Sequence, residues 1–300
     1  MNWRKFFRPL YRPLLDILPP KWNAIAHYIY IHKTIPNLAA PRGFNEKIVW
    51  RKLYDRDPRM PDMVDKIKVK AIIANRFGPS AVIPALRVYE SADAMNFKDW
   101  PLNKPPYVIK ANHGSGMNLF VRDANDIADP KSLRAKCEEF LNRDHAAEVE
   151  EWAYAPVQRR IFVEPYIDIP QGGLTDYKFH VFSGKIFGVE VVTDRYGHYN
   201  ITFMNRAWEP MDIRVYAKRP HAQTPPPKPP EYAKMVAMAE EIGKKFPYIR
   251  VDLYDINGIP TFGEATFYPS GGHDSFDPPE WDRIFGDQWI QDWTQRKQSS

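Results

Sequence analysis

The sequence predicts an α+β protein in which a helical N-terminal region precedes mainly antiparallel β-structure. Helix signals dominate residues 1–80, whereas short apolar runs separated by Gly, Asn and Pro follow from Ala81 onward. Two later stretches, 175–193 and 248–270, alternate apolar and polar residues on both sides of a turn and are predicted hairpins. We expect three units, comprising residues 1–80, 81–165 and 166–300.

Composition indicates a globular chain with a sizeable core. The 300 residues are 44% hydrophobic, and no apolar run approaches the roughly 18 residues that span a bilayer. The single Cys137 can form neither an intramolecular disulfide nor a cysteine metal cluster. The start of the chain lacks the pattern of a secretion signal. We therefore expect a reducing, cytoplasmic location.

The positive charge is concentrated at the start of the chain. The net charge is +5, and residues 1–22 contain five basic residues against Asp16 alone. Because the remainder is nearly neutral, we expect no nucleic-acid partner. Basic residues alternate there with aromatic and aliphatic ones, which is typical of a segment lying on anionic lipid. Prolines interrupt a long helix here, so we favour packing of these aromatics on the protein itself, with peripheral contact with the inner membrane through residues 1–22 as the alternative.

Three helices are predicted in the first unit. One covers 22–31, a second covers 46–54 with Asn45 as its cap, and a third covers 61–77 before Gly78 ends it. Charged side chains along the third helix are interpreted as a solvated surface; they are Asp65, Lys66, Lys68 and Lys70.

Residues 107–121 read as a strand, a loop of small residues and a second strand. Small residues let backbone N–H groups approach phosphate oxygens, and Lys110 at the strand end supplies positive charge. A flexible hairpin loop is the alternative. The stretch has neither the P-loop pattern nor a following helix, and Ser115 lacks the setting of a hydrolase nucleophile. The candidate loop residues are His113, Gly114, Ser115, Gly116 and Asn118.

Two apolar strands carry charged residues. Within 161–167, Glu164 stands before Pro165, which ends regular pairing and marks a hinge at a ligand cleft. A surface glutamate is the alternative. The strand over 175–182 has a polar face that a solubilising edge position would also explain. That face comprises Asp176, Lys178 and His180.

The next segments are predicted to be mostly connections. Residues 195–212 read as a loop, 219–230 as a proline-rich extended connector, and 231–246 as an amphipathic helix. After His273 the chain reads as loop. The histidines have no zinc-ligand spacing. Possible substrate contacts in the first loop are His198, Asn200 and Arg206.

The hairpin over 248–270 depends on its register. A two-residue turn at Asn257-Gly258 would place Asp252 opposite Gly263, so that Asp252 and Glu264 would point to opposite faces. A three-residue loop, Ile256-Asn257-Gly258, would instead pair Asp252 with Phe262 and Arg250 with Glu264. We predict the second register, which puts four polar residues on one face: Arg250, Asp252, Glu264 and Thr266.

This face has the chemistry of a metal and phosphate site. Asp252 and Glu264 would be diagonal neighbours, and hard oxygen ligands of this kind suit Mg²⁺ that also holds nucleotide phosphates. Arg250 beside them could stabilise charge on a transferred phosphoryl group. An ordinary cross-strand ion pair between Arg250 and Glu264 on a solvated face is the alternative.

The ordered set of motifs resembles the ATP-grasp superfamily, and more closely the TupA-like ATP-grasp proteins of bacterial surface-polysaccharide gene clusters. The resemblance covers roughly residues 40 to 275. The segments that carry it are FNEKIVWRKLYDRD, VDKIKVK, YVIKANHGSGMN, FVEPYI, DYKFHVFSGK and RVDLYDINGIPTFGEATFYPSGG.

The resemblance implies an ATP-grasp fold whose two α+β lobes clasp ATP beneath the glycine loop. Many relatives have Glu-x-Asn as the last metal pair, whereas Glu264-Ala265-Thr266 places a hydroxyl there. The implied roles are phosphate binding by Lys110 and Lys178, nucleotide binding by His113, Gly114, Ser115, Gly116, Glu164 and Asp176, Mg²⁺ binding by Asp252, Glu264 and Thr266, and catalysis by Arg250 and Lys178.

The resemblance also implies a reaction class. ATP-grasp enzymes commonly phosphorylate a carboxylate and let an amine attack the acylphosphate, so we expect a ligase of surface-polysaccharide biosynthesis. Its substrate would be a saccharide or amino acid bearing a carboxylate or hydroxyl. A phosphotransferase acting on a sugar, a glycosyltransferase and a non-catalytic binding protein are the alternatives.

Overall fold

The computed structural model describes residues 19–167, 174–193, 200–215 and 224–294. His198 and most of the basic segment 1–22 lie outside the described residues. Among the residues that are described, no helix is long and apolar enough to cross a bilayer.

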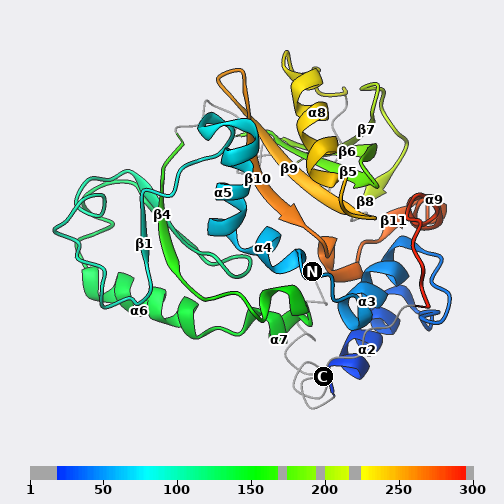
Figure 1. Ribbon diagram of the computed structural model, residues 1–300, viewed down its shortest axis with the longest axis horizontal. Coiled ribbons are helices and arrows are strands. Elements are labelled where there is room, and N and C mark those ends of the chain that lie inside the picture. Colours follow the sequence, from blue (N-terminus) through cyan, green and yellow to red (C-terminus); the bar gives the residue numbers. More distant parts are fainter. Residues whose placement is uncertain (1–18, 168–173, 194–199, 216–223, 295–300) are drawn as a thin grey trace.

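Antiparallel strands form the framework of the molecule (Figure 1). They are β1 (Arg87–Tyr89), β2 (Tyr107–Ala111), β3 (Asn118–Val121), β4 (Ile161–Pro165), β5 (Asp176–Phe182), β6 (Lys185–Thr193), β7 (Asn200–Asn205), β8 (Arg214–Val215), β9 (Ile249–Ile256), β10 (Ile259–Thr266) and β11 (Phe276–Asp277). A smaller sheet has the order β1-β4-β2-β3, and a larger sheet has the order β10-β9-β5-β6-β7. Neighbouring strands in both sheets are antiparallel, which confirms the α+β class.

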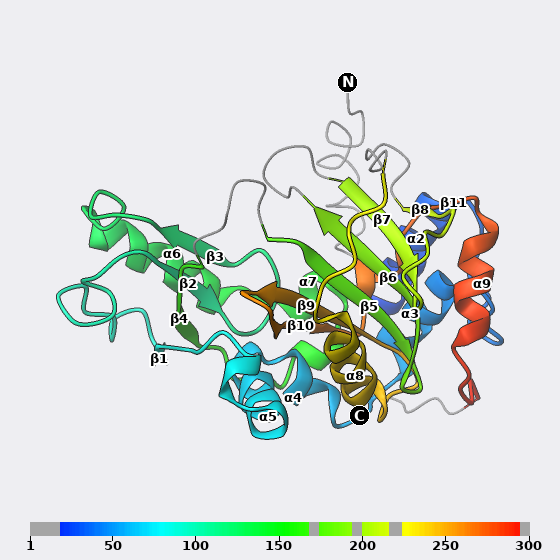
Figure 2. The same cartoon turned by 90° about the horizontal axis from the view of Figure 1, so that it is seen from above.

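Helices surround the two sheets (Figure 2). The α-helices are α2 (Pro20–His32), α3 (Phe44–Tyr54), α4 (Met60–Val64), α5 (Lys66–Phe77), α6 (Pro130–Asn142), α7 (His145–Val149), α8 (Tyr232–Gly243) and α9 (Glu280–Gln288), and short 3₁₀ turns cover Pro79–Ala81, Trp152–Tyr154 and Pro269–Gly272. Figures 1 and 2 both place the smaller sheet with α6 on one side and the larger sheet with α8 on the other.

The N-terminal helices differ from prediction in how they begin. Asn45 is not a cap: it lies inside α3 and donates to the Asp274 carbonyl at 2.9 Å. The Glu46 carboxylate instead accepts from the Gly43 N–H at 3.1 Å, which satisfies the start of α3. The predicted third helix is two helices, because Asp65 leaves the helical conformation and caps α5 by accepting from the Ile67 N–H.

Two segments predicted as loops contain regular structure. Residues 200–205 form β7, because Ile201 and Phe203 are buried where the strand pairs with β6. The chain after His273 forms β11 and α9, and Phe285 of α9 is fully buried among aromatic rings. These segments are short or rich in polar residues, so their apolar contacts are made only in the folded chain.

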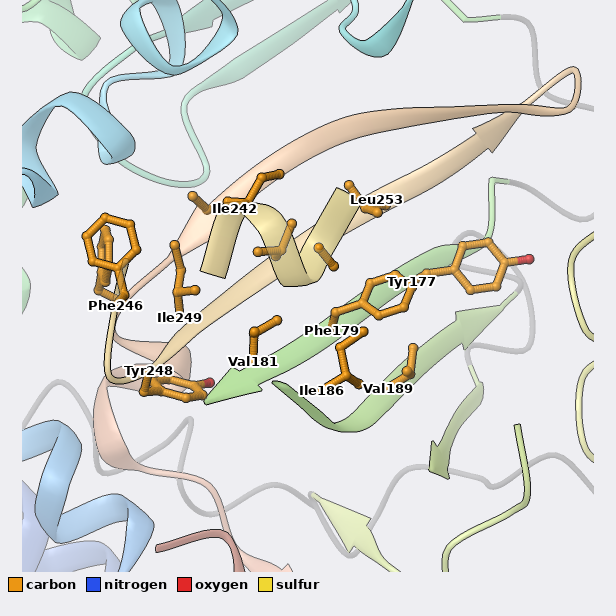
Figure 3. Close-up of a cluster of buried hydrophobic side chains, with 14 of the residues drawn as sticks. Tyr177, Phe179, Val181, Ile186, Val189, Ile242, Phe246, Tyr248, Ile249 and Leu253 are labelled. Atoms are coloured by element: carbon orange, nitrogen blue, oxygen red, sulfur yellow. The ribbon is translucent and has the colours of Figure 1, made fainter. Parts of the chain in front are cut away.

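The main hydrophobic core lies between the larger sheet and α8 (Figure 3). Phe179 and Val181 of β5 pack there with Ile242 of α8, and Phe44 and Ile48 of α3 belong to the same cluster. Each such side chain contributes about 1.5–3 kcal/mol through burial. A separate cluster beneath the smaller sheet includes Ile109, Cys137 and Val163. The apolar residues of β5 and β9 thus occupy one face, which leaves the other face for polar residues.

Candidate functional site

The register of the β9–β10 hairpin differs from the one predicted. Ile256 pairs with Ile259, so Asn257-Gly258 is a two-residue turn, and both turn residues have positive φ. The ladder then slips by one residue between Phe262 and Glu264, so that Glu264 lies opposite Asp252. We had expected a three-residue loop to bring Glu264 and Thr266 onto the face of Arg250 and Asp252. The bulge does this instead, because one extra residue in β10 reverses the direction of the side chains that follow it.

A row of charged residues crosses this face of the larger sheet. Glu190 of β6 is opposite Lys178, Lys178 is opposite Asp252, and Asp252 is opposite Glu264. In the neighbouring row, Arg250 is opposite Thr266. The structure therefore brings Arg250, Asp252, Glu264 and Thr266 together, and it adds Lys178 from a strand 70 residues earlier in the chain.

Asp252 is the centre of this group. Arg250 donates to both of its carboxylate oxygens at 2.8 Å, and Lys178 donates to Oδ2 at 2.9 Å. Burial would raise the pKa of Asp252, but Arg250 and Lys178 outweigh burial and hold the pKa at about 2. The same carboxylate raises the pKa of Lys178 against the opposing effect of burial. Asp252 is therefore ionised, and both cations remain charged near neutral pH.

A second ion-pair group lies on the smaller sheet. The Glu164 carboxylate on β4 contacts Lys110 of β2 and Lys70 of α5, each at 2.5 Å. Burial would raise the pKa of Glu164, but these two lysines outweigh burial and hold it below its usual range. The Lys110 side chain is 32% exposed, compared with 11% for Lys70 and 4% for Glu164. Lys110 is thus the member best placed to reach a ligand.

Hydrogen bonds at its first residues fix the glycine loop between β2 and β3. Asn112 donates to Asp65 at 2.9 Å and accepts from the Arg160 N–H at 2.8 Å. Gly114 passes so close to His145 that an added Cβ would lie 2.6 Å from the ring, so only glycine fits. The loop is therefore anchored at its base on α5 rather than being a free hairpin end.

Lys66 connects the glycine loop to the metal-site hairpin. Its ammonium group donates to the Gly114 carbonyl at 2.6 Å and lies 3.4 Å from a Glu264 oxygen. Lys68, two residues later, is exposed and pairs with Asp62. The interpretation of this helix as a solvated surface is therefore right for Lys68 and wrong for its neighbours, because Asp65, Lys66 and Lys70 face the interior or the cleft.

Two cavities open between these elements. The first, of about 480 Å³, lies between the sheets; residues that line it are Lys66, Lys110, Gly114, Ser115, Gly116, Glu164, Tyr166, Leu174, Tyr254 and Glu264. The second, of about 550 Å³, is lined on one side by Arg250, Glu264 and Thr266. Ser115 and Glu264 line both cavities, so the two adjoin at the tip of the glycine loop.

Some predicted site residues lie away from these cavities. His113 is 2% exposed and approaches the Arg143 carbonyl at 3.3 Å, and it lines neither cavity. Asp176 is buried 3.4 Å from the Lys178 ammonium group and likewise lines neither. Lys178 and Asp252 also line neither cavity, although Arg250 and Glu264, which adjoin Asp252, both line the second. The structure therefore places His113 beneath the loop and Asp176 behind the charged row.

The second cavity also contains residues that no sequence motif indicated. Lys52 of α3 pairs with Glu150 at 3.1 Å, both side chains being almost fully buried. Glu151 and His273 line the same space. These residues lie in three separate parts of the chain, so no spacing pattern could have grouped them. A repeated lysine at positions 66 and 70 was the available signal for the first cavity, because residues four apart share a helix face.

The residues at the hairpin fit Mg²⁺ by their chemistry. Two carboxylates and a hydroxyl on one face are hard oxygen donors, which Mg²⁺ prefers, and phosphate oxygens usually complete its coordination. The Asp252 carboxylate is engaged by Arg250 and Lys178. In the part of the chain that is described, no group of three or more His, Cys, Asp or Glu side chains is arranged to hold a metal ion. A cation there would accordingly depend on phosphate oxygens as well as Asp252, Glu264 and Thr266.

Comparison with known families gives a match over most of the chain. A family model described as TupA-like ATPgrasp matches residues 46–290. No curated protein sequence matches significantly.

Solved structures show distant similarity. A D-alanine–D-alanine ligase from Bacillus anthracis, complexed with ATP, is 15% identical at a TM-score of 0.39, with 68% of this chain and 54% of that chain covered. The ATP-grasp ligase PsnB with its minimal precursor, Mg and ADP is 12% identical at 0.38, with 74% and 57% covered. An L-amino acid ligase from Bacillus licheniformis is 14% identical at 0.38, with 70% and 42% covered. The chain thus spans little more than half the length of the first two structures.

Proposed function

Since the chain belongs to the TupA-like ATP-grasp family and has the ATP-grasp fold, we propose that it is an ATP- and Mg²⁺-dependent ligase that forms an acylphosphate and passes the acyl group to an amine. The observation that carries this proposal is the junction of the two cavities at Ser115 and Glu264. A nucleotide in the first cavity would have its terminal phosphate facing the second, where another substrate has room.

The first cavity suits ATP in shape and charge. Its lining includes Val108, Phe120 and Tyr254, which can enclose a base. It also includes Lys110, Lys66 and the glycine loop, which can hold phosphates. Glu164 orients Lys110 through a 2.5 Å contact. We assign Lys110, Lys66 and the backbone of residues 114–116 to phosphate binding.

Asp252, Glu264 and Thr266 are the residues that would hold Mg²⁺, which would neutralise phosphate charge in the reaction. Arg250 and Lys178 are cations fixed by Asp252, and Arg250 lines the second cavity. They can stabilise the negative charge that develops as a phosphoryl group moves. A substrate carboxylate oxygen would form the new bond to the γ-phosphorus, and the bond from that phosphorus to the β–γ bridging oxygen would break, with ADP leaving.

The acceptor class and setting are part of the proposal. We assign a saccharide or amino acid of bacterial surface-polysaccharide biosynthesis as the substrate, and a cytoplasmic location with contact to the inner membrane through residues 1–22. Phosphoryl transfer to a sugar hydroxyl would use the same nucleotide site, and sugar transfer would not. Product analysis distinguishes a ligase from a phosphotransferase, because only a ligase releases inorganic phosphate together with an amide.

Calorimetric titration of ADP with and without Mg²⁺ tests the nucleotide site. Wild-type protein should bind ADP more tightly with Mg²⁺, and an Asp252→Asn/Glu264→Gln variant should lose that dependence. A matched control, Asp62→Asn/Glu241→Gln, changes two exposed carboxylates that pair with Lys68 and Arg76 and should bind like wild type. Binding of UDP-sugars without binding of ADP by folded protein would overturn the proposal.

A further inference from the structure

Most of the second cavity is built from residues that take no part in the proposed nucleotide site. The cavity is lined by Tyr30 of α2, Lys52 of α3 and Gly271, and by the segment 148–151 at the end of α7. At about 550 Å³, the space is large enough for a monosaccharide or an amino acid. Arg250 and Glu264 close its inner end, so a molecule bound here would face the terminal phosphate of a nucleotide.

The cations around this cavity are already paired. Lys52 binds Glu150 at 3.1 Å, and Arg250 binds both oxygens of Asp252. Burial lowers the pKa of His145 to about 4, with Arg143 adding to the effect, so His145 is neutral at pH 7. Burial likewise lowers the pKa of His273. No unpaired positive charge among these residues is left to receive a substrate carboxylate.

The three carboxylates of the segment 148–151 differ in whether they are paired with a cation. Glu148 is held by Arg143 at 2.7–2.9 Å. One oxygen of Glu150 contacts Lys52, while the other, Oε1, is buried with no hydrogen-bond partner among the described residues. The Glu151 side chain has neither a hydrogen bond nor an ion pair within the described part of the chain, although it lines the cavity; the Glu151 backbone N–H donates to the Ala146 carbonyl at 3.0 Å. The Glu150 and Glu151 carboxylates on this wall would therefore be stabilised by a ligand that donates hydrogen bonds and carries positive charge.

The local backbone supports a ligand-binding role for this wall. Glu150 has φ 53°, a left-handed conformation that costs a non-glycine residue about 1 kcal/mol or more. This conformation ends α7 at Val149, and both Glu150 and Glu151 line the cavity. Burial raises the pKa of Glu151 to about 8 against the opposing effect of Lys52, and the nearby Glu264 and Glu150 add to the increase. An ammonium group bound beside Glu151 would compensate for the lost hydration of its carboxylate and for the repulsion by the neighbouring carboxylates.

We propose that the second cavity is the subsite of the amine nucleophile, and that Glu151 binds its ammonium group and takes the proton that must leave before attack. The amine nitrogen then forms a bond to the acylphosphate carbonyl carbon, the bond from that carbon to the phosphate oxygen breaks, and inorganic phosphate leaves with the electron pair. Nitrogen loses two protons on the way from ammonium to amide: the first goes to Glu151, and the second leaves with the inorganic phosphate. Glu150, fixed by Lys52, is a positioning residue that accepts a second hydrogen bond. This inference rests on the proposed function.

Glucosamine and glucose are a suitable pair of probes, because they differ by one amino group. Glutamate labelled with ¹³C at the carboxyl carbon allows the titration of Glu151 to be followed by NMR, with the signal assigned from the Glu151→Gln variant. In the presence of Mg²⁺ and ADP, glucosamine should lower the titration midpoint of Glu151, and glucose should leave it unchanged. A residue with only a structural role would not respond to the amino group.

Binding measurements with variants complete the test. Glu151→Gln should weaken glucosamine binding by about tenfold, since a hydrogen bond to a charged group is lost, while affinity for Mg²⁺ with ADP stays as in wild type. Glu241→Gln is the control, because Glu241 pairs with Arg76 and does not line this cavity; this variant should bind glucosamine normally. Thermal unfolding of each variant establishes that it is folded.

The outcomes separate this inference from the proposed function. Failure of wild type to bind ADP with Mg²⁺ would remove the proposed function itself. Normal nucleotide binding with no effect of glucosamine on Glu151 would overturn the inference alone. Loss of nucleotide binding in Glu151→Gln would also overturn it, because Glu151 would then belong to the metal site. Binding of glucuronate in place of glucosamine would assign the cavity to the acyl donor and overturn it as well.

Discussion

Glu264 lies directly opposite Asp252 because Gly263 is an extra residue in β10. Without that bulge, the two-residue turn at Asn257-Gly258 would direct the two carboxylates to opposite faces of the hairpin. With it, both carboxylates meet beside Lys178 and Arg250. The geometry of the candidate metal site thus depends on one glycine that carries no functional group.

Gly263→Val should impair the site through the backbone. Even a Cβ at this position would lie 2.6 Å from the Tyr254 ring and 3.2 Å from the Asp252 carbonyl, so the bulge must distort. We expect the Mg²⁺-dependent affinity for ADP to fall about tenfold or more, measured by calorimetry. Gly258→Val at the turn is the comparison; nothing crowds that position, and its positive φ should reduce stability without moving Glu264. Equal loss of affinity in both variants would contradict a specific role for the bulge.

Lys66→Met should weaken ADP binding by about tenfold, because a cation would be lost between the glycine loop and Glu264. Lys68→Met, on the same helix, removes an exposed lysine and should have little effect. Titration calorimetry of both proteins with ADP and Mg²⁺ compares them directly. If the two substitutions behave alike, Lys66 is part of a solvated surface after all.

Glu164→Gln should destabilise the smaller sheet. Lys70 is buried beside Glu164, and removing one partner of a buried ion pair typically costs about 3–5 kcal/mol. Urea unfolding at pH 7 gives the difference in unfolding free energy. As control, Glu241→Gln disrupts an exposed pair with Arg76 and should cost less than about 1 kcal/mol. A cost for Glu164→Gln no larger than that of the control would show that Lys70 is solvated in solution.

The contribution of Asp252 to the free energy of unfolding should decrease at acidic pH. Its pKa in the folded protein is about 2, below the value near 4 of an unfolded chain, so the unfolded state binds the proton more readily. The stabilisation is therefore complete above about pH 4 and is lost as the pH falls towards 2. Unfolding free energies of wild type and Asp252→Asn should converge over that range. A constant difference between pH 5 and pH 3 would be inconsistent with ionised Asp252 as the partner of Arg250.

Local sequence patterns determined much of this protein. Alternation of apolar and polar residues predicted the strands around Lys178 and Asp252, and small residues predicted the loop at 113–116, because such patterns depend only on neighbours along the chain. The motif order likewise indicated the family over roughly residues 40 to 275, and the family model matches residues 46–290. The predicted face of Arg250, Asp252, Glu264 and Thr266 has the same members in the structure, although it is reached by a different register.

Tertiary structure alone decided which charged residues face the cleft. Lys66 and Lys68 have the same chemistry in the sequence, and only packing of α5 against the glycine loop distinguishes them. The second cavity joins Lys52, Glu151 and Gly271, which are about 100 residues or more apart. Burial and nearby charged side chains together determine the pKa of Glu151. Both are properties of surroundings that chain segments distant in sequence create only when they fold together.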